Sequence, residues 1–110
     1  MRRRGRASKP DANQAALVRY ARGLGISVLI VAELPSGALD LVVGAFGRDG
    51  RVEVKDGSKP PSARKLTEAE QVTFSAWKGA RPMIWLDEDD ALEWWRYCVD
   101  NPLERDRGEA

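Results

Sequence analysis

Hydrophobic and polar residues follow one another in blocks that predict seven elements in the order α-β-β-β-α-β-α. Leu17, Tyr20 and Leu24 recur at helical spacing, which predicts a first helix over 12–24. The nearly all-apolar run 26–33 is typical of a central strand. Three further strands are expected at 39–43, 51–55 and 81–86.

Helix-capping residues mark the two later helices. Thr67 and Glu70 form a capping box that predicts a helix continuing to about residue 78, where Gly79 ends it. Asp87 is placed to cap a last helix, and Pro102 ends that helix. The pattern therefore predicts an α/β fold with a four-stranded mixed sheet flanked by helices and an extra C-terminal helix.

The length of 110 residues allows one domain and no second core. We expect a basic disordered arm over 1–10, a single domain over 11–100 and a frayed tail over 101–110. No stretch approaches the roughly 20 apolar residues of a membrane span, and no secretory segment follows the basic start. These features predict a cytoplasmic protein that does not bind membranes.

The missing residue types exclude several kinds of active site. The chain has no histidine and one cysteine, Cys98. This excludes histidine-based catalytic triads, histidine-ligated zinc and an internal disulfide. A buried small hydrophobe is the expected role of Cys98. Because carboxylates are the strong ligands that remain, any bound metal should be Mg²⁺, Mn²⁺ or Ca²⁺.

The net charge of +1 hides an uneven distribution. Residues 1–10 carry +5 and residues 87–110 carry −6. A basic arm of this kind is typical of phosphate binding, although a solvated, disordered start explains it equally well. The basic residues of the arm are Arg2, Arg3, Arg4, Arg6 and Lys9.

Three charged residues lie within or beside the two expected strands 39–43 and 51–55. Asp40 stands between two leucines, and Glu53 and Lys55 occupy one face of the next strand. A carboxylate within an apolar strand is costly unless it is exposed, paired or bound to a metal. On spacing alone, an ordinary solvent-exposed ion pair between Glu53 and Lys55 is the favoured interpretation.

Two registers are open to these strands. A tight turn at Asp49-Gly50 would place Asp40 six residues, about 20 Å, from the residue opposite Glu53. Pairing Val42 with Arg51 instead brings Asp40 opposite Glu53, with a long glycine-rich connection over 43–50. We predict the second register, because only it gives the buried carboxylate a partner.

The strings Gly-Ala-Leu-Asp-Leu-Val-Val-Gly (37–44) and Val-Glu-Val-Lys (52–55), with the segment 53–71, resemble the PD-(D/E)XK nuclease superfamily. The resemblance covers about residues 11–95. It is to small phage and prophage proteins near the virus-type replication-repair nucleases and the Holliday-junction-resolvase-like groups. It implies a restriction-endonuclease-like αβββαβ core, the same element order that the hydrophobic pattern predicts.

The resemblance also implies roles for single residues. Asp40 and Glu53 would bind Mg²⁺ or Mn²⁺ together with the Val54 carbonyl, Lys55 would be the catalytic lysine, and Gln71 would lie near the lysine or the metal. Leu39 stands where the family usually has proline. Where many relatives carry a glutamate on the first helix, the nearest residues here are Asn13 and Gln14.

The expected function is that of a Mg²⁺-dependent DNA endonuclease, a homodimer acting on branched or structured DNA in phage replication, recombination or packaging. The alternatives are a non-catalytic DNA-binding or assembly accessory module and, less favoured, an RNA nuclease. Beside the site, the loop residues expected to contact phosphates are Ser58, Lys59, Arg64 and Lys65. Core or interface positions are expected, rather than base stacking, for Trp77, Trp85, Trp94 and Trp95.

Overall fold

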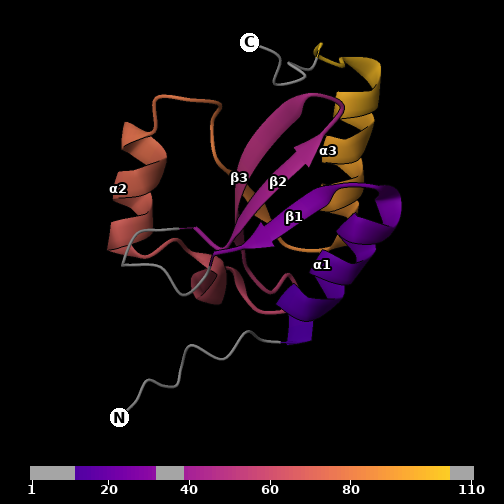
Figure 1. Ribbon diagram of the computed structural model, residues 1–110. Helices are drawn as coiled ribbons and strands as arrows, with labels where there is room; N and C mark the ends of the chain where they lie inside the picture. The colour runs from indigo at the N-terminus through magenta and orange to yellow at the C-terminus, as the bar shows by residue number, and fades with distance from the viewer. Residues whose placement is uncertain (1–11, 32–38, 105–110) are drawn as a thin grey trace.

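The computed structural model describes residues 12–31 and 39–104 (Figure 1). These residues form an α/β fold with a four-stranded mixed sheet and three α-helices, as the sequence predicts at this coarse level. The helices are α1 (Ala12–Leu24), α2 (Glu68–Ala76) and α3 (Glu88–Asp100), and a 3₁₀ helix η1 covers Pro61–Arg64. The strands are β1 (Ser27–Ile30), β2 (Leu41–Ala45), β3 (Arg48–Val54) and β4 (Met83–Trp85).

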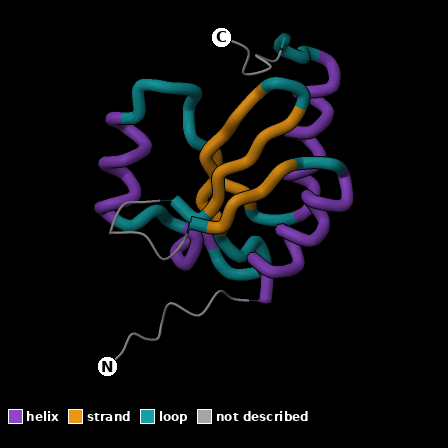
Figure 2. The backbone as a smooth tube through the Cα atoms, viewed as in Figure 1, coloured by secondary structure: helices purple, strands orange, loops and turns teal. Residues whose placement is uncertain are grey.

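The strands stand in the order β1-β2-β3-β4. The first three form an antiparallel meander, and β4 returns parallel to β3 after the chain has passed through α2 (Figure 2). Both β1 and β4 are therefore edge strands. The edge position of β4 agrees with Pro82 just before it, because proline cannot donate a ladder hydrogen bond.

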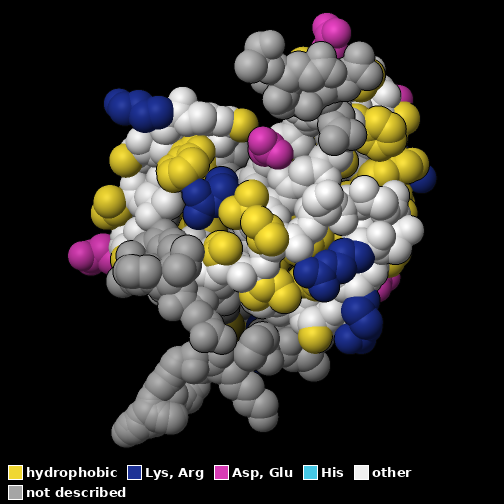
Figure 3. All heavy atoms as spheres, in the orientation of Figure 1, with side chains coloured by type: hydrophobic (Ala, Val, Ile, Leu, Met, Phe, Trp, Pro, Cys, Tyr) yellow, Lys and Arg dark blue, Asp and Glu magenta, His cyan; other side chains and the backbone are white. Residues whose placement is uncertain are grey.

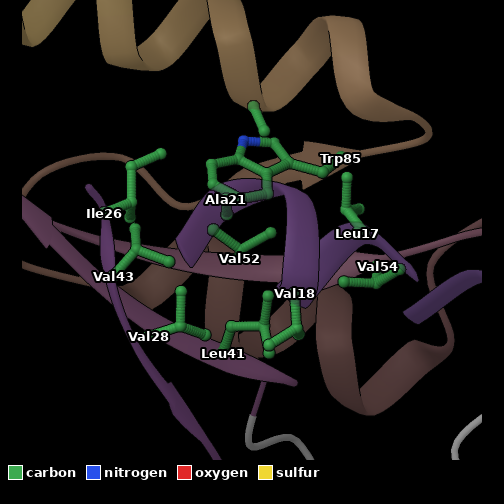
Figure 4. Packing of buried hydrophobic residues seen from close by; sticks show 11 residues of the cluster. Leu17, Val18, Ala21, Ile26, Val28, Leu41, Val43, Val52, Val54 and Trp85 are labelled. Carbon is green, nitrogen blue, oxygen red and sulfur yellow. The ribbon is translucent and has the colours of Figure 1, made fainter. Parts of the chain in front are cut away.

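One face of the sheet, the core face, packs against α1 and α3. Leu17, Val18 and Ala21 form the buried stripe of α1 and lie over the alternate side chains of the strands (Figure 4). Trp85 joins this cluster from β4 and is only 2% exposed. The strand residues of the core face are Val28, Leu41, Val43, Val52 and Val54.

The opposite face, here the α2 face, carries the residues that alternate with the core. Leu29, Val42 and Arg51 form one row across β1, β2 and β3 on this face. Glu53 follows two residues after Arg51 and is paired with Ile84 of β4. Figure 1 shows α2 standing apart from α1 and α3, and α2 has no buried residue among its nine.

The predicted register is confirmed, but the predicted connection is wrong. Val42 pairs with Arg51, as expected, yet β2 and β3 continue to Ala45 and Arg48. The turn consists of Phe46 and Gly47, whose φ angles are +53° and +83°. Positive φ at both central residues is the type I′ geometry that matches the twist of a hairpin. The chain thus reaches this register with a two-residue turn, and the residues at 49 and 50 lie within β3.

Other predictions of position and bounds need correction. The strands expected at 39–43, 51–55 and 81–86 lie at 41–45, 48–54 and 83–85, and α2 ends at Ala76 rather than near residue 78. The run 26–33 does not form a central strand, since β1 lies at the edge and Leu29 is 66% exposed. The first helix has the predicted bounds 12–24, and the next residue, Gly25, has a φ of +98°. The sequence also offers Asp11 as a cap for the first helix and Pro-Ser-Gly (35–37) as a turn; both lie outside the described residues. The capping box and the Asp87 cap are confirmed.

None of the helices in the described part of the chain combines the length and the apolar character required to cross a membrane. Beyond α3 the described chain contacts the β2–β3 turn, where the Leu103 N–H donates a hydrogen bond to the Phe46 carbonyl (2.9 Å).

The Gly47 turn gives a stability prediction. Replacing Gly47 with alanine places a Cβ at positive φ and against the Leu103 carbonyl. We expect Gly47→Ala to lower the free energy of unfolding by about 2 kcal/mol or more, as measured by urea denaturation. Gly23→Ala is the matched control: its Cβ meets nothing within 4 Å, and it should stabilise helix α1 by about 0.5–1 kcal/mol. Equal effects of the two variants would contradict this account of the turn.

Candidate active site

The β2–β3 register brings Asp40 and Glu53 together. The pair Leu41 and Val52 is followed at this end of the ladder by Asp40 on one strand and Glu53 on the other. The Asp40 carboxylate accepts a hydrogen bond from the Val54 backbone N–H (2.8 Å), which holds it against the end of β3. Asp40 is half-buried, whereas Glu53 is only 4% exposed. Two of the residues expected to bind a metal are therefore adjacent.

Lys55 lies on the same face and contacts two carboxylates. Its Nζ atom is 3.4 Å from Glu53 Oε2 and 3.1 Å from Glu70 Oε1. The backbone around it is held on both sides, because the Lys55 N–H donates to the Trp85 carbonyl (3.1 Å) and the Lys55 carbonyl accepts from Asn13 Nδ2 (3.0 Å). The first turn of α1 thus reaches the site through Asn13, one of the two residues expected there. Gln14, the other, is buried.

Glu70 belongs to the same cluster, although the sequence analysis assigned it only to a capping box. Its Oε1 atom accepts the Thr67 backbone N–H (2.8 Å) and also contacts Lys55 Nζ. The Glu70 N–H in turn donates to Thr67 Oγ1 (3.2 Å). The cap therefore positions a third carboxylate beside the lysine. The capping box places Glu70 in the first turn of its helix, but the sequence carries no signal that Lys55 lies opposite.

Three carboxylates around one ammonium leave the site short of positive charge. Burial, followed by the negative charge of Asp40 and the proximity of Glu70, raises the pKa of Glu53 to about 9. Burial also raises the pKa of Asp40, in spite of its hydrogen bond from Val54. Glu53 thus holds a proton at neutral pH when no cation is bound. A divalent cation would take the place of that proton.

The charges of the other two groups are stabilised by their neighbours. Burial alone would lower the pKa of Lys55, but Glu70 and Glu53 outweigh it and raise that pKa above the ordinary value. Burial would likewise raise the pKa of Glu70, but its hydrogen bonds with Thr67, Glu53 and Lys55 lower it. Lys55 and Glu70 are therefore an ionised pair at neutral pH.

The donor set of this site fits a hard divalent cation. Glu53 Oε1 is a buried oxygen that accepts no hydrogen bond from the residues the structure describes. Carboxylate and carbonyl oxygens are the ligands that Mg²⁺ prefers, and Mg²⁺ retains several waters beside one or two carboxylates. Within the described ranges no group of three His, Cys, Asp or Glu residues is arranged to enclose a metal.

The structure does not bring Gln71 into this cluster. Gln71 is exposed, and its amide Nε2 donates to the Leu66 carbonyl (3.3 Å) at the start of its own helix. Glu70, one residue earlier, contacts the lysine instead. A helix turns about 100° per residue, so neighbouring positions cannot both face the site.

The loop residues predicted to bind phosphates follow directly after the site. Ser58 donates through its N–H and Oγ to Asp56 Oδ1 (2.9 and 2.7 Å), which forms a tight turn and lowers the pKa of Asp56. Lys59 and Lys65 are exposed, while Arg64 is half-buried and its Nε meets no acceptor among the described residues. The arm residues Arg2, Arg3, Arg4 and Arg6 lie outside the described residues.

The expected core role of the tryptophans is confirmed for three of the four. Trp85 is buried, and Trp94 and Trp95 pack against the core cluster from α3. Trp77, just after α2, is 42% exposed and lies under the Arg51 guanidinium instead. Cys98 is a free, buried cysteine, as expected.

Comparison with protein-family models, with curated proteins and with solved structures finds no match for this chain.

The raised pKa of Glu53 predicts how stability depends on pH. Glu53 keeps its proton up to about pH 9 in the folded protein, whereas the unfolded chain releases it near pH 4.3. The folded state thus binds more protons between these values, and the free energy of unfolding must fall as pH rises from about 5 to 9. We expect Tm to decrease by about 5 °C or more over this pH range when a chelator keeps the protein free of metal.

Glu53→Gln should flatten that dependence, because the amide does not titrate. Glu93 on α3 is exposed, so Glu93→Gln serves as the control and should show the same pH profile as the wild type. A wild-type Tm that stays constant or rises over this range would show that Glu53 is ionised in the folded protein.

Proposed function

We propose that this protein is a Mg²⁺-dependent DNA endonuclease that hydrolyses phosphodiester bonds. The observation that carries the proposal is the buried Glu53, which lies across the ladder from Asp40 and has Lys55 Nζ 3.4 Å from its carboxylate. Metal-dependent phosphodiester hydrolysis uses these parts: paired carboxylates that hold a metal ion, and a fixed ammonium group beside them. The sequence resemblance to PD-(D/E)XK nucleases supports the same reaction.

Asp40, Glu53 and the Val54 carbonyl are the groups that would hold the cation. Bound Mg²⁺ supplies neutralisation of the scissile phosphate and a lower pKa for a coordinated water. Asp40 is kept in position by the Val54 N–H (2.8 Å), at the end of the strand that carries Glu53. Pre-positioned ligands of this kind lower the cost of binding.

Lys55 acts as a fixed positive charge in this scheme. Glu70 and Glu53 raise the pKa of Lys55, which favours its protonated ammonium in the metal-free protein. Its ammonium donates hydrogen bonds to the negative charge that develops on the phosphate oxygens. Glu70 is a positioning residue: it holds Nζ at 3.1 Å and is itself held by Thr67.

DNA is the proposed substrate because the sequence places basic residues directly after the acids and at the start of the chain. The loop with Lys59, Arg64 and Lys65 follows β3 directly, and the sequence places five further basic residues in the first ten. Such groups bind phosphates irrespective of base sequence. The resemblance supports branched or structured DNA of phage replication, recombination or packaging, a cytoplasmic location in a bacterial host, and a homodimer.

A non-catalytic DNA-binding module is the second candidate. It is favoured by one observation: Lys55 already contacts both Glu53 and Glu70, so part of the acidic charge is compensated without a metal. Such a module would bind DNA and show no Lys55-dependent cleavage. A cleavage panel of linear, flap, fork and four-way DNA with Mg²⁺ or Mn²⁺ separates the two functions.

Substitution of the site should separate metal binding from catalysis. Lys55→Ala should lower the cleavage rate by about 100-fold or more and keep the Mg²⁺-induced rise in Tm. Asp40→Asn and Glu53→Gln should lose both the cleavage activity and the Mg²⁺-induced rise in Tm. Lys78→Ala, which removes an exposed lysine after α2, is the control and should cut like the wild type. Equal nicking by the wild type and Lys55→Ala would identify a contaminating nuclease.

The basic arm should contribute affinity rather than chemistry. Deleting residues 1–9 removes five positive charges and should weaken DNA binding by about tenfold or more at low salt. The slope of log Kd against log salt should fall by about one for each phosphate that the arm neutralises. Fluorescence anisotropy over a salt series measures both quantities. A slope equal to that of the full chain would show that the arm does not bind phosphate.

A further inference from the structure

Arg51 lies beside the acidic cluster on the same face of the sheet. It precedes Glu53 by two residues on β3, so its Cα lies about 6.6 Å away along the strand and its side chain projects from the α2 face as well. That separation is comparable to one nucleotide step along a DNA strand. A phosphate next to one bound at the acids would therefore come within reach of Arg51.

The Arg51 guanidinium has no anionic partner among the described residues. Both ion pairs found in this part of the chain belong to Lys55. Arg51 Nε is buried and meets no acceptor within the described ranges. A buried donor left without a hydrogen bond is destabilising, so the position favours a ligand that brings an acceptor oxygen.

Trp77 supplies an aromatic surface at the same place. Its ring lies under the guanidinium, with 4.6 Å from Arg51 Cζ to the ring centroid, and it remains 42% exposed. The Gly79 backbone packs close to the indole ring, since a Cβ at this position would lie 3.0 Å from Trp77 Nε1. Figure 3 shows hydrophobic side chains gathered beside a basic one between α2 and the sheet.

A second arginine–aromatic pair in the molecule serves as a comparison. Arg48 lies over Tyr97 at 4.9 Å, at the opposite end of β3. Its Nε donates to the Asn101 carbonyl, so that pair ties α3 to the hairpin. Arg51 Nε finds no such acceptor in the described part of the chain. The two pairs share their geometry but differ in whether the guanidinium Nε already has an acceptor.

We infer that Arg51 and Trp77 bind an unpaired nucleotide next to the scissile phosphate, with the guanidinium on its phosphate and the indole stacked on its base. The inference rests on the proposed nuclease function and adds its substrate class. A base within a duplex is covered by its neighbours and cannot stack on a side chain, whereas a base in a flap, bubble or branch can. The preferred substrate is therefore DNA with an unpaired nucleotide beside the cut.

Binding and cleavage are measured on two matched DNAs, a flap and a fully paired duplex of the same sequence. Binding uses the Lys55→Ala background with Mg²⁺, and cleavage uses the wild-type background. Trp77→Leu should weaken flap binding about tenfold or more, since base stacking of this strength is usual, and leave duplex binding within about twofold. Trp77→Phe should retain most of the affinity. Arg51→Gln should weaken flap binding and lower its salt slope by about one.

Tyr97→Leu and Arg48→Gln are the matched controls at the far end of the sheet and should leave flap preference unchanged. Thermal unfolding checks that each variant is folded, and Arg51→Gln keeps the test valid if Trp77→Leu does not fold. Flap binding that is indifferent to both Trp77→Leu and Arg51→Gln overturns the inference. If cleavage depends on Lys55 but flap binding does not depend on Arg51 and Trp77, only the nucleotide site is overturned. If flap binding depends on Arg51 and Trp77 but no cleavage depends on Lys55, only the nuclease function is overturned.

Discussion

The register of the β2–β3 hairpin is the constraint on which the candidate site depends. A shift of two residues would preserve the alternation of buried and exposed side chains and still separate Asp40 from Glu53. The Phe46–Gly47 turn prevents that shift, because its two positive φ values allow the strands to reverse at one place. The chemistry at one end of the sheet is thus determined by backbone geometry at the other.

The acids at that end are costly to bury, and the rest of the site offsets the cost. Glu53 keeps a proton, Asp40 accepts a backbone N–H, and Glu70 shares Lys55 with Glu53. Buried polar groups held in this way contribute little to stability but much to a single arrangement. The cluster also connects α2 to the sheet, so the same contacts join the fold to the proposed chemistry.

The sequence predicted most of the elements and the pairing of Asp40 with Glu53, because apolar periodicity and the cost of a lone buried carboxylate both act locally. It missed the turn at Phe46, since phenylalanine at positive φ is rare and Asp49-Gly50 is the stronger turn signal. The family resemblance indicated Gln71 and not Glu70, and the capping box shows what Glu70 does for its own helix but not which residue lies opposite. The exposure of Trp77 depends on where α2 packs, which periodicity does not report.

The absence of buried residues in α2 has a consequence for the motions of the protein. Helices α1 and α3 bury apolar side chains and can leave the sheet only if the core opens. By contrast, α2 is held to the sheet through an ion pair and a stacked guanidinium. Local opening free energies follow such differences in burial. The amides of α2 should therefore exchange with solvent through a local opening that leaves the hairpin and its acids intact, which would give a bulky polymer access to them.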